Sequence, residues 1–329
     1  MASRVADTRS DDYADDHRAL RSVLARMPRF DGDTARITPL PGGLTNRIYK
    51  ISPRAGAPLV GRVSFGQSSL LAIDRLAECH NSDAAARAGV APAVVACEPA
   101  EGVSVIEWID GRTFGPADID DSAQLIRIAA LCRNLHRGPR FVNDFDMFAV
   151  QQGYLGIVQD RGFRLPAGYL DHASRVERIR TALAARPEPT VPCHNDLLAA
   201  NMMDDGARLW FIDFEYAGNN DPCFELGNIW SEAELGLDRL EELVTAYYGE
   251  PSPARTARAR LYALMARYGW TLWASIQAAV SDVDFDFWSW GQEKYARAVE
   301  EFTGPQLDRL IDDVQQTDTT AREQSQWRS

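Results

Sequence analysis

The sequence is poor in lysine, and its few cysteines show no spacing typical of a metal site or of a disulfide-rich domain. Lys50 and Lys294 are the only lysines among 329 residues, and the formal net charge is −12. An acidic chain of this kind is disfavoured as a partner of nucleic acid or of an anionic membrane surface. The five cysteines include no CxxC pair, so we expect neither a disulfide framework nor a zinc site, and a reducing compartment fits.

Long apolar stretches are also missing. The N-terminus is rich in Asp and lacks the apolar core of a signal peptide, and no apolar run approaches the length of a membrane span. We therefore expect a soluble cytoplasmic protein without membrane insertion. With 45% hydrophobic residues, the chain is long enough to form two sizeable packed lobes. Its oligomeric state stays open, a homodimer included.

The segment 191–232 carries a set of residues suited to phosphoryl transfer. Asp196 follows His194 in an HxD triplet, Asn201 comes five positions after Asp196, and Asp213 lies in a later apolar strand. Phosphoryl transfer from a nucleotide needs a carboxylate that takes the proton of the acceptor hydroxyl, and an Asn oxygen and a second carboxylate that hold Mg²⁺. Asp196 fits the first role, and Asn201 and Asp213 fit the metal-binding role.

The turn between these residues supports this interpretation. Asp204-Asp205-Gly206 is typical of a hairpin turn, which would fold Asp213 back beside Asn201, as a shared metal requires. An isolated HxD triplet often arises by chance, and Asp and Asn are common loop and cap residues. The joint pattern of HxDxxxxN, a turn and an Asp in a hydrophobic strand is far more specific.

A pair of glycines near the N-terminus predicts a phosphate-binding loop. Gly42 and Gly43 lie between strands expected at 37–40 and 47–51. Such a loop lays backbone N–H groups over nucleotide phosphates, although many Gly-Gly pairs simply make hairpins. Its position ahead of the catalytic segment favours the nucleotide role.

The next expected strand, 59–65, is predicted to supply the basic group of the nucleotide site. Its alternation places Val60 and Arg62 on one face, which in a kinase-like lobe covers the nucleotide. Arg62 is expected to hold phosphate, and Glu78, in the middle of the following helix, is its natural partner. A surface position for Glu78 fits the spacing equally well. Lys50 is the rival for the phosphate role, and we expect it to be a solvated strand residue.

Helical patterns dominate after residue 110. We expect helices over 122–137, 168–186, 237–248, 254–280 and 284–302, with an irregular, aromatic stretch at 141–166. Near the N-terminus, residues 1–10 are expected to be disordered and an amphipathic helix to begin at Asp11. This pattern divides the chain into an N-terminal nucleotide-binding lobe, 1–110, and a C-terminal catalytic and acceptor-binding lobe, 111–329.

Aromatic residues gather on two of these helices. Trp270 and Trp273 share one face of the helix at 254–280, and Phe287 and Trp290 share a face of the next. Together they would form a cage for a quaternary ammonium, which has no hydrogen-bond donors and is held by cation–π attraction. Aromatic residues more often form ordinary helix–helix core, and from the residues alone that alternative stays open.

Three segments, HNDLLAAN, IDFEYAGNNDP and FELGNIWSE, resemble the phosphotransfer motif and its sequel in the choline/ethanolamine kinase family. The similarity includes the loop GGLTN and the tryptophan-rich helices, so it spans most of the chain. It implies an α+β, two-lobed protein-kinase-like fold, with a small N-lobe (antiparallel sheet plus helix) and a larger, mostly helical C-lobe. It also implies a kinase that uses ATP and Mg²⁺ to phosphorylate choline or ethanolamine.

The resemblance also assigns residues to two substrate sites. The nucleotide site that it implies consists of Gly43, Thr45, Asn46, Arg62, Glu78, Glu107 and Ile109. The acceptor site that it implies consists of Glu232, Trp270, Trp273, Phe287 and Trp290, with Glu232 near the substrate ammonium. Two positions depart from the family pattern. Glu225 replaces the usual Asp, which puts that residue's contact with the catalytic loop in doubt, and Ala199 replaces a frequent Pro.

We therefore predict a kinase that transfers the γ-phosphoryl of ATP to choline or, as second choice, to ethanolamine. One rival is a kinase of another amine-bearing alcohol, of the aminoglycoside or thiamine type. Aminoglycoside pockets meet several amines with many carboxylates, whereas this sequence offers rings and one obvious acid. A rival from another class is a catalytically inactive choline-binding module, against which the presence of Asp196, Asn201 and Asp213 argues.

Overall fold

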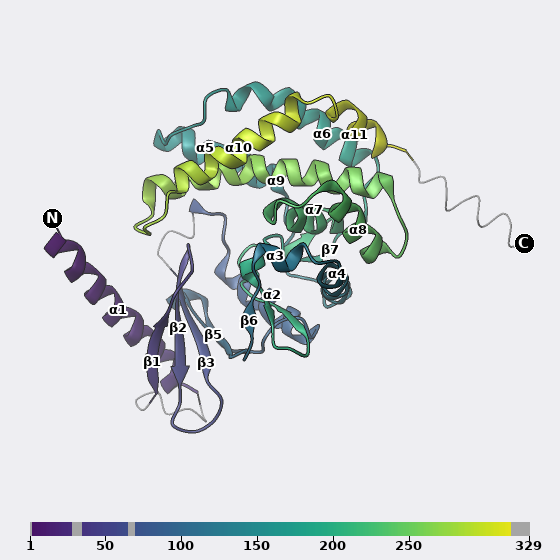
Figure 1. Cartoon of the computed structure of the whole chain (residues 1–329). Helices are drawn as coiled ribbons and strands as arrows, with labels where there is room; N and C mark the ends of the chain where they lie inside the picture. The colour runs from purple at the N-terminus through teal and green to yellow at the C-terminus, as the bar shows by residue number, and fades with distance from the viewer. Residues whose placement is uncertain (1, 28–34, 65–69, 317–329) are drawn as a thin grey trace, which may run out of the picture.

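The computed structural model describes residues 2–27, 35–64 and 70–316, with side chains from residue 14 onward. It has the two-lobed α+β fold expected from the sequence: an antiparallel sheet in the N-terminal part and a mostly helical C-terminal part. Figure 1 shows the sheet, with α1 running along it, below the layer of long helices. We propose that the lobes meet near residue 110, between the last strand of the sheet and the first C-terminal helix.

The N-terminal sheet has five antiparallel strands in the order β1-β2-β3-β5-β4. They are β1 (Arg36–Leu40), β2 (Asn46–Ser52), β3 (Leu59–Ser64), β4 (Val94–Glu98) and β5 (Val103–Glu107). Alternate residues of β3 are buried, because this face packs against α1 (Ala2–Ala25). Helix and sheet approach closely at Gly61, where a Cβ would come within 2.6 Å of the Leu20 side chain.

The first helix is longer than the sequence predicts. Disorder was expected over residues 1–10 and a helix from Asp11, whereas α1 begins at Ala2; residue 1 lies outside the described residues. Adding a residue to an existing helix costs little, and Ala and Arg are good helix formers. The helix therefore extends back through the segment that was expected to be disordered.

The helix after β3 and the C-terminal helices make up most of the rest of the molecule. They are α2 (Arg75–Arg87), α3 (Pro116–Ile119), α4 (Ser122–His136), α5 (Met147–Arg161), α6 (Ala173–Ala185), α7 (Pro222–Glu232), α8 (Leu237–Tyr248), α9 (Pro253–Val280), α10 (Phe287–Thr303) and α11 (Leu307–Asp313). Helices α4, α8, α9 and α10 agree closely with the predicted ranges. Figure 1 shows α9 crossing the centre of the helical part, where it packs against α5, α7 and α10.

Helix α5 lies in the stretch that was expected to be irregular, so that prediction is wrong. Asp146 caps the helix by accepting a hydrogen bond from the backbone N–H of Phe148, at 2.9 Å. One face is buried and packs in the core with residues of α9; its residues are Met147, Gln151, Tyr154 and Val158. Gly153 and Gly156 lower the helix propensity of the segment. Tertiary packing decides its structure instead.

Two small sheets support the catalytic segment. Strand β7 (Val191–Cys193) pairs with β10 (Gly218–Asn220), and β8 (Met202–Asp204) pairs with β9 (Leu209–Phe211) and with β6 (Arg112–Thr113). The hairpin predicted between Asn201 and Asp213 is thus confirmed as β8 and β9, but Asp213 lies beyond the end of β9 and not within the strand, and it has φ +68°. Its turn is fixed by Asp205, which accepts hydrogen bonds from the backbone N–H groups of Ala207 and Arg208.

The sequence predicted no disulfide framework, but the structure contains one disulfide that the cysteine spacing did not indicate. Cys79 of α2 and Cys97 of β4 are joined by a disulfide with their Cα atoms 6.0 Å apart, while the other three cysteines are free and buried. Eighteen positions separate the pair in the chain, and only the packing of α2 against β4 brings the two together. In the described part of the chain, no helix has both the length and the apolar character needed to cross a membrane.

Candidate active site

A cavity of about 650 Å³ lies between the sheet and the helical part. Most of the residues predicted for the nucleotide, the phosphoryl transfer and the acceptor line it together. They are Gly43, Thr45, Arg62, Glu78, Glu107, Ile109, Asp196, Asn201, Asp213, Glu232, Trp270, Trp273 and Trp290. Asn46 and Phe287 are the two predicted residues that lie outside the lining. The structure therefore brings residues far apart in the sequence into one hollow.

The catalytic loop begins where β7 ends and turns sharply at Asn195. Asn195 has φ +67°, a left-handed conformation that Asn tolerates better than most residues. Its side-chain amide holds this turn by donating to the carbonyls of Cys193, Tyr216 and Gly218, at 3.2, 3.0 and 3.2 Å. The turn directs the next residue, Asp196, into the cavity lining.

Hydrogen bonds hold together the segments that carry the three residues predicted to perform the chemistry. Asn201 donates through Nδ2 to the backbone carbonyl of Asp196 at 2.8 Å. The backbone carbonyl of Asn201 accepts a hydrogen bond from the N–H of Ile212 at 3.0 Å. His194 Nε2 donates to the carbonyl of Ile212 at 2.8 Å, and its Nδ1 accepts from the N–H of Asp196 at 3.3 Å. Asp213 follows Ile212 directly, so the loop and the strand end are held side by side.

The site changes the proton affinity of two of these side chains. Burial raises the pKa of Asp196 well above its ordinary value, and the negative charges of Glu232, Glu215 and Asp213 raise it further. Burial also lowers the pKa of His194, so the imidazole is neutral, as its two hydrogen bonds require. A carboxylate with a raised pKa is a stronger base, which suits proton removal from a hydroxyl.

Arg62 connects the sheet to the catalytic segment. Its guanidinium forms ion pairs with Glu78 of α2 and with Asp213, which the hairpin presents from the other side of the cavity. The ion pair expected between Arg62 and Glu78 is therefore present. Lys50 instead places its ammonium 3.9 Å from the ring centre of Trp108, and it is absent from the cavity lining. The structure favours Arg62 over Lys50 as the phosphate-facing base.

Glu215 has no role in the prediction from sequence, yet it anchors the glycine loop. It accepts hydrogen bonds from Thr45 Oγ1 at 2.9 Å and Asn46 Nδ2 at 3.0 Å, and it pairs with Arg75 of α2 at 3.2 Å. The Thr45 and Asn46 side chains thus bond to the protein, which leaves backbone N–H groups as the loop's groups for phosphate. Glu215 lies within the IDFEY segment, so a signal for it was present; nothing in the sequence points to Arg75.

Two further contacts define the glycine loop. Gly43 has φ +85°, and a Cβ there would lie 2.3 Å from the carbonyl oxygen of Asn46, so only glycine fits. The carbonyl of Leu44 accepts a hydrogen bond from Gln277 Nε2 of α9 at 3.3 Å. The helix that carries Trp270 and Trp273 is therefore bonded to the loop expected to cover the nucleotide.

Aromatic side chains from three segments form one end of the cavity, the end that the sequence predicts to hold the acceptor. Trp270 and Trp273 of α9 and Trp290 of α10 line it, and Phe287 packs behind Trp273 with ring centres 5.6 Å apart. Tyr216, which the prediction from sequence omits, also lines the cavity and accepts a hydrogen bond from Trp273 Nε1 at 2.9 Å. Three tryptophans and a tyrosine thus line the cavity, whereas Phe287 belongs to the core behind them.

Glu232 lies at the same end, where it forms an ion pair with Lys294 of α10. The Lys294 ammonium is 2.7 Å from each carboxylate oxygen of Glu232 and 4.4 Å from the ring centre of Trp290. Trp290 and Lys294 are four positions apart on α10 and share a helix face, but nothing in the sequence indicates that Lys294 reaches Glu232. The predicted partner of the substrate ammonium thus already has a cation from the protein.

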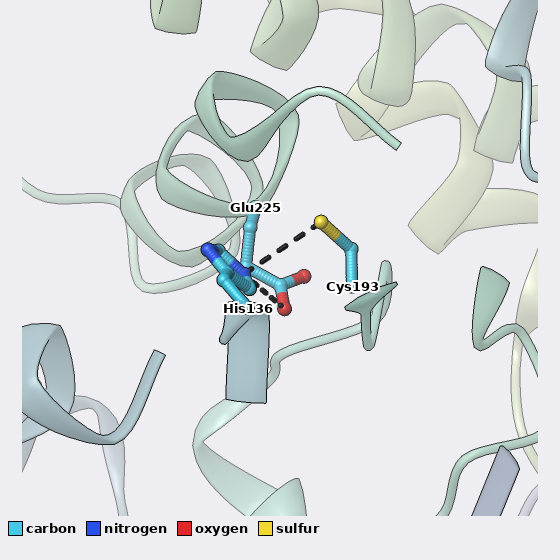
Figure 2. A group of neighbouring side chains, drawn as sticks. All are labelled: His136, Cys193 and Glu225. Carbon is cyan, nitrogen blue, oxygen red and sulfur yellow. Dashed lines mark hydrogen bonds and ion pairs between the residues drawn. The ribbon is translucent and has the colours of Figure 1, made fainter. Parts of the chain in front are cut away.

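Glu225 supports the catalytic loop from behind. Its two carboxylate oxygens accept the backbone N–H groups of His194 and Asn195, each at 2.8 Å. Figure 2 shows His136 and Cys193 beside it, with His136 Nε2 3.6 Å from the carboxylate and 3.6 Å from the thiol. The contact that the Asp-to-Glu departure put in doubt is therefore made by Glu225.

These three buried side chains also offer an imidazole, a thiol and a carboxylate within 4.8 Å of one another. A metal would require a thiolate, but burial beside Glu225 raises the pKa of Cys193 well above its ordinary value. Both oxygens of Glu225 are already used by backbone N–H groups. The His136, Cys193 and Glu225 cluster is better suited to holding the catalytic loop than to binding an ion.

Comparison with known proteins places this arrangement among phosphotransferases. Residues 36–264 match the model of a family described as the phosphotransferase enzyme family. A choline/ethanolamine kinase family protein from Mesorhizobium loti has a similar structure with a TM-score of 0.76; the two sequences are 34% identical, and the match covers 90% of this chain and 97% of that one.

Two further relatives carry more specific names. Ethanolamine kinase 2 of Mus musculus is 28% identical over 304 residues, covering 82% of this chain and 77% of that protein. Choline kinase LicA from Streptococcus pneumoniae has a TM-score of 0.70 at 23% identity, covering 81% of this chain and 93% of that one. A structure of LicA in complex with AMP is similarly related, with a TM-score of 0.68 at 22% identity. The last two likenesses establish the fold.

Proposed function

The chain belongs to the phosphotransferase enzyme family, in its choline/ethanolamine kinase branch, and from this premise we propose that it phosphorylates choline or, as second choice, ethanolamine with ATP. The observation that carries the proposal is the shared cavity. Asp196 and Asp213 line it together with the aromatic acceptor end formed by Trp270, Trp273 and Trp290. A small acceptor in that end would present its hydroxyl to a base beside the expected phosphate position.

Asp196 is proposed to orient the acceptor hydroxyl and to take its proton. Its raised pKa gives it the basicity for this step, and its backbone is fixed by His194 and Asn201. Placing hydroxyl and phosphate in one closed site accounts for much of the catalysis in phosphoryl transfer, since little covalent chemistry is left to the protein.

Asn201 and Asp213 are proposed to hold Mg²⁺. An amide oxygen and a carboxylate are the hard oxygen donors that this ion prefers, so the residues present fit it. The Nδ2 of Asn201 is bonded to the Asp196 carbonyl, which leaves its amide oxygen, the metal-binding atom, outside that bond. When bound, the ion would neutralise charge that develops on the transferring phosphoryl group. Arg62 and the backbone of the glycine loop are proposed to bind the phosphates.

The cavity's charges argue against an aminoglycoside as the acceptor. Four of the carboxylates in its lining are paired with cations of the described protein: Glu78 and Asp213 with Arg62, Glu215 with Arg75, and Glu232 with Lys294. A polyamine needs several carboxylates without such partners. An acceptor with one ammonium and mostly apolar surface fits the tryptophan-lined end better.

The test is a coupled ADP-release assay over choline, ethanolamine, thiamine and aminoglycosides, with the phosphorylated product identified by mass. We expect turnover with choline or ethanolamine, loss of turnover in Asp196→Ala, and ATP affinity unchanged in that variant. ATP binding without turnover of any acceptor would support an inactive choline-binding module instead. Turnover restricted to thiamine or an aminoglycoside would assign the other kinase class.

A further inference from the structure

The acceptor end of the cavity contains a cation that belongs to the protein itself. Lys294 contacts both carboxylate oxygens of Glu232 at 2.7 Å and lies 4.4 Å from the ring centre of Trp290. The Lys294 and Glu232 side chains are only 12% and 8% exposed. An ion pair so far removed from water is hard to open, because separating the partners leaves a buried charge uncompensated.

This ion pair changes what the acceptor end offers to a substrate. A carboxylate beside aromatic rings is what a substrate ammonium needs, but Lys294 already uses both oxygens of Glu232 and one face of Trp290. Glu78, Asp213 and Glu215 line the same cavity and are paired with Arg62 or Arg75. The proposed base, Asp196, is needed by the acceptor hydroxyl. The remaining carboxylate of the lining, Glu107, belongs to the expected nucleotide site, so what remains for the ammonium is the rings of Trp270, Trp273 and Tyr216.

Primary and quaternary ammonium groups respond differently to such a site. A primary ammonium carries three N–H donors, and each donor that loses water without gaining an acceptor costs free energy. A trimethylammonium has no donors and binds through cation–π attraction and apolar contact with rings. A site with rings but without an unpaired carboxylate therefore favours the methylated group.

We propose that Lys294 is a specificity-determining residue, which occupies Glu232 and thereby makes the acceptor site select a fully methylated ammonium over a primary one. This inference rests on the proposed function, since it presumes an amino-alcohol acceptor. It assigns to Lys294 a role that needs no contact with the substrate: it removes the hydrogen-bond acceptor that a primary amine requires.

The experiment compares kcat/KM for choline, dimethylethanolamine, methylethanolamine and ethanolamine. In the unaltered enzyme, kcat/KM is expected to fall with each methyl group removed. Lys294→Met keeps a side chain of similar length without the charge and releases Glu232. We expect the ethanolamine-to-choline ratio of kcat/KM to rise about tenfold or more, the value of a hydrogen bond to a charged group. Lys294→Arg should keep the original ratio.

Two further variants separate charge from shape and stability. Glu232→Gln combined with Lys294→Met removes both charges, so it leaves no unpaired buried carboxylate and is expected to keep the preference for choline. Arg297→Met removes another α10 cation, which pairs with Glu234 at the surface. We expect kcat/KM for all four substrates to be unchanged in that variant. Thermal melting of each variant checks its folding, and the double variant carries the test where Lys294→Met is unstable.

The outcomes distinguish this inference from the proposed function. Absence of turnover with all four amino alcohols would remove the proposed function itself. Equal use of choline and ethanolamine by the unaltered enzyme would show that Lys294 moves away and leaves Glu232 to the substrate. An unchanged ratio in folded Lys294→Met, or a lost preference in the double variant, would overturn the role of Lys294 while leaving the kinase assignment intact.

Discussion

Arg62 forms an ion pair with Asp213 across 151 positions of the chain. The first residue belongs to the sheet and the second follows the catalytic hairpin, so this contact closes the cavity at the place where phosphate and metal are expected. The same guanidinium also pairs with Glu78 of α2. Substrate binding must therefore compete with, or reuse, a contact that already holds the two lobes together.

Replacing this arginine tests its proposed phosphate role. We expect Arg62→Gln to raise the KM for ATP about tenfold or more, because a charge-assisted contact with phosphate is lost. Lys50→Gln is the matched control, since Lys50 is absent from the cavity lining, although the Trp108 ring beside its ammonium belongs to that lining. Steady-state kinetics at saturating choline measures both. An equal effect of the two substitutions would return the phosphate role to Lys50.

Asp196→Asn is expected to lower turnover by about 10²-fold or more and yet to stabilise the substrate-free protein. The folded-state pKa of Asp196 is raised by burial, so keeping it ionised at neutral pH costs folding free energy. That cost grows as the pH rises from the ordinary Asp pKa through the raised one, and Asn does not carry it. Melting curves of both proteins should converge toward pH 4 and separate at pH 8; a variant that melts lower at pH 8 contradicts this.

Trp273→Ala should raise the KM for choline by about tenfold, because an aromatic wall of the acceptor end is removed, while ATP affinity stays the same. Trp288→Ala offers a control: it removes an indole from α10 that stacks with Arg164, and it does not line the cavity. The comparison requires both variants to be folded at the assay temperature. An unaltered choline KM would reduce Trp273 to a core residue.

Glu225→Gln should destabilise the protein and reduce kcat more than KM. One of the N–H groups of His194 and Asn195 then faces an NH₂ group instead of an acceptor, at a cost of about 1–3 kcal/mol. Burial raises the pKa of Glu225, but its interactions with His136 and the loop outweigh this and lower it overall. The Glu225 carboxylate therefore stabilises the folded protein fully at a pH above the ordinary Glu pKa. This stabilisation is lost as the pH falls through the lowered pKa of the folded state. Urea unfolding between pH 3 and 7 measures the difference, which should shrink in acid.

Removal of the disulfide should lower stability without affecting the other cysteines. Cys79→Ser with Cys97→Ser opens a loop of 18 positions, a change worth about 3 kcal/mol in the chain-entropy account. A reducing agent should destabilise the unaltered protein to the same extent and leave the double variant unaffected. If reductant has no effect on the unaltered protein, the two cysteines are thiols in solution.

The meeting of Asp196, Asn201 and Asp213 in one cavity could be predicted from sequence because the three residues are close in the chain. Asp196, Asn201 and Asp213 lie within one loop and one hairpin, and the turn residues between them report the geometry. Residues that depend on long-range packing gave no such signal. Arg75 of α2 reaches Glu215 across 140 positions of the chain, and Lys294 reaches Glu232 because α7 and α10 both pack against α9.

The errors in the fold have the same origin. Helix α5 was missed because Gly153 and Gly156 weaken its local preference, while burial against α9 fixes it. The pairing of Cys79 with Cys97 follows from two elements meeting in space, about which the spacing of cysteines in the chain says nothing. Local patterns thus predicted most of the long helices and the catalytic hairpin, whereas tertiary contacts decided which elements and side chains meet.

Helix α9 carries Trp270 and Trp273 of the proposed acceptor site, and its Gln277 donates a hydrogen bond to the Leu44 carbonyl in the loop proposed to cover the nucleotide. If the loop moves outward to release the product nucleotide, the hydrogen bond between Gln277 and Leu44 must lengthen or break. An amine acceptor bound against the tryptophans would make α9 more rigid and so slow the opening of the loop. Release of the nucleotide would in turn weaken binding of the amine. We therefore expect positive cooperativity between the two ligands: each should increase the binding affinity of the other.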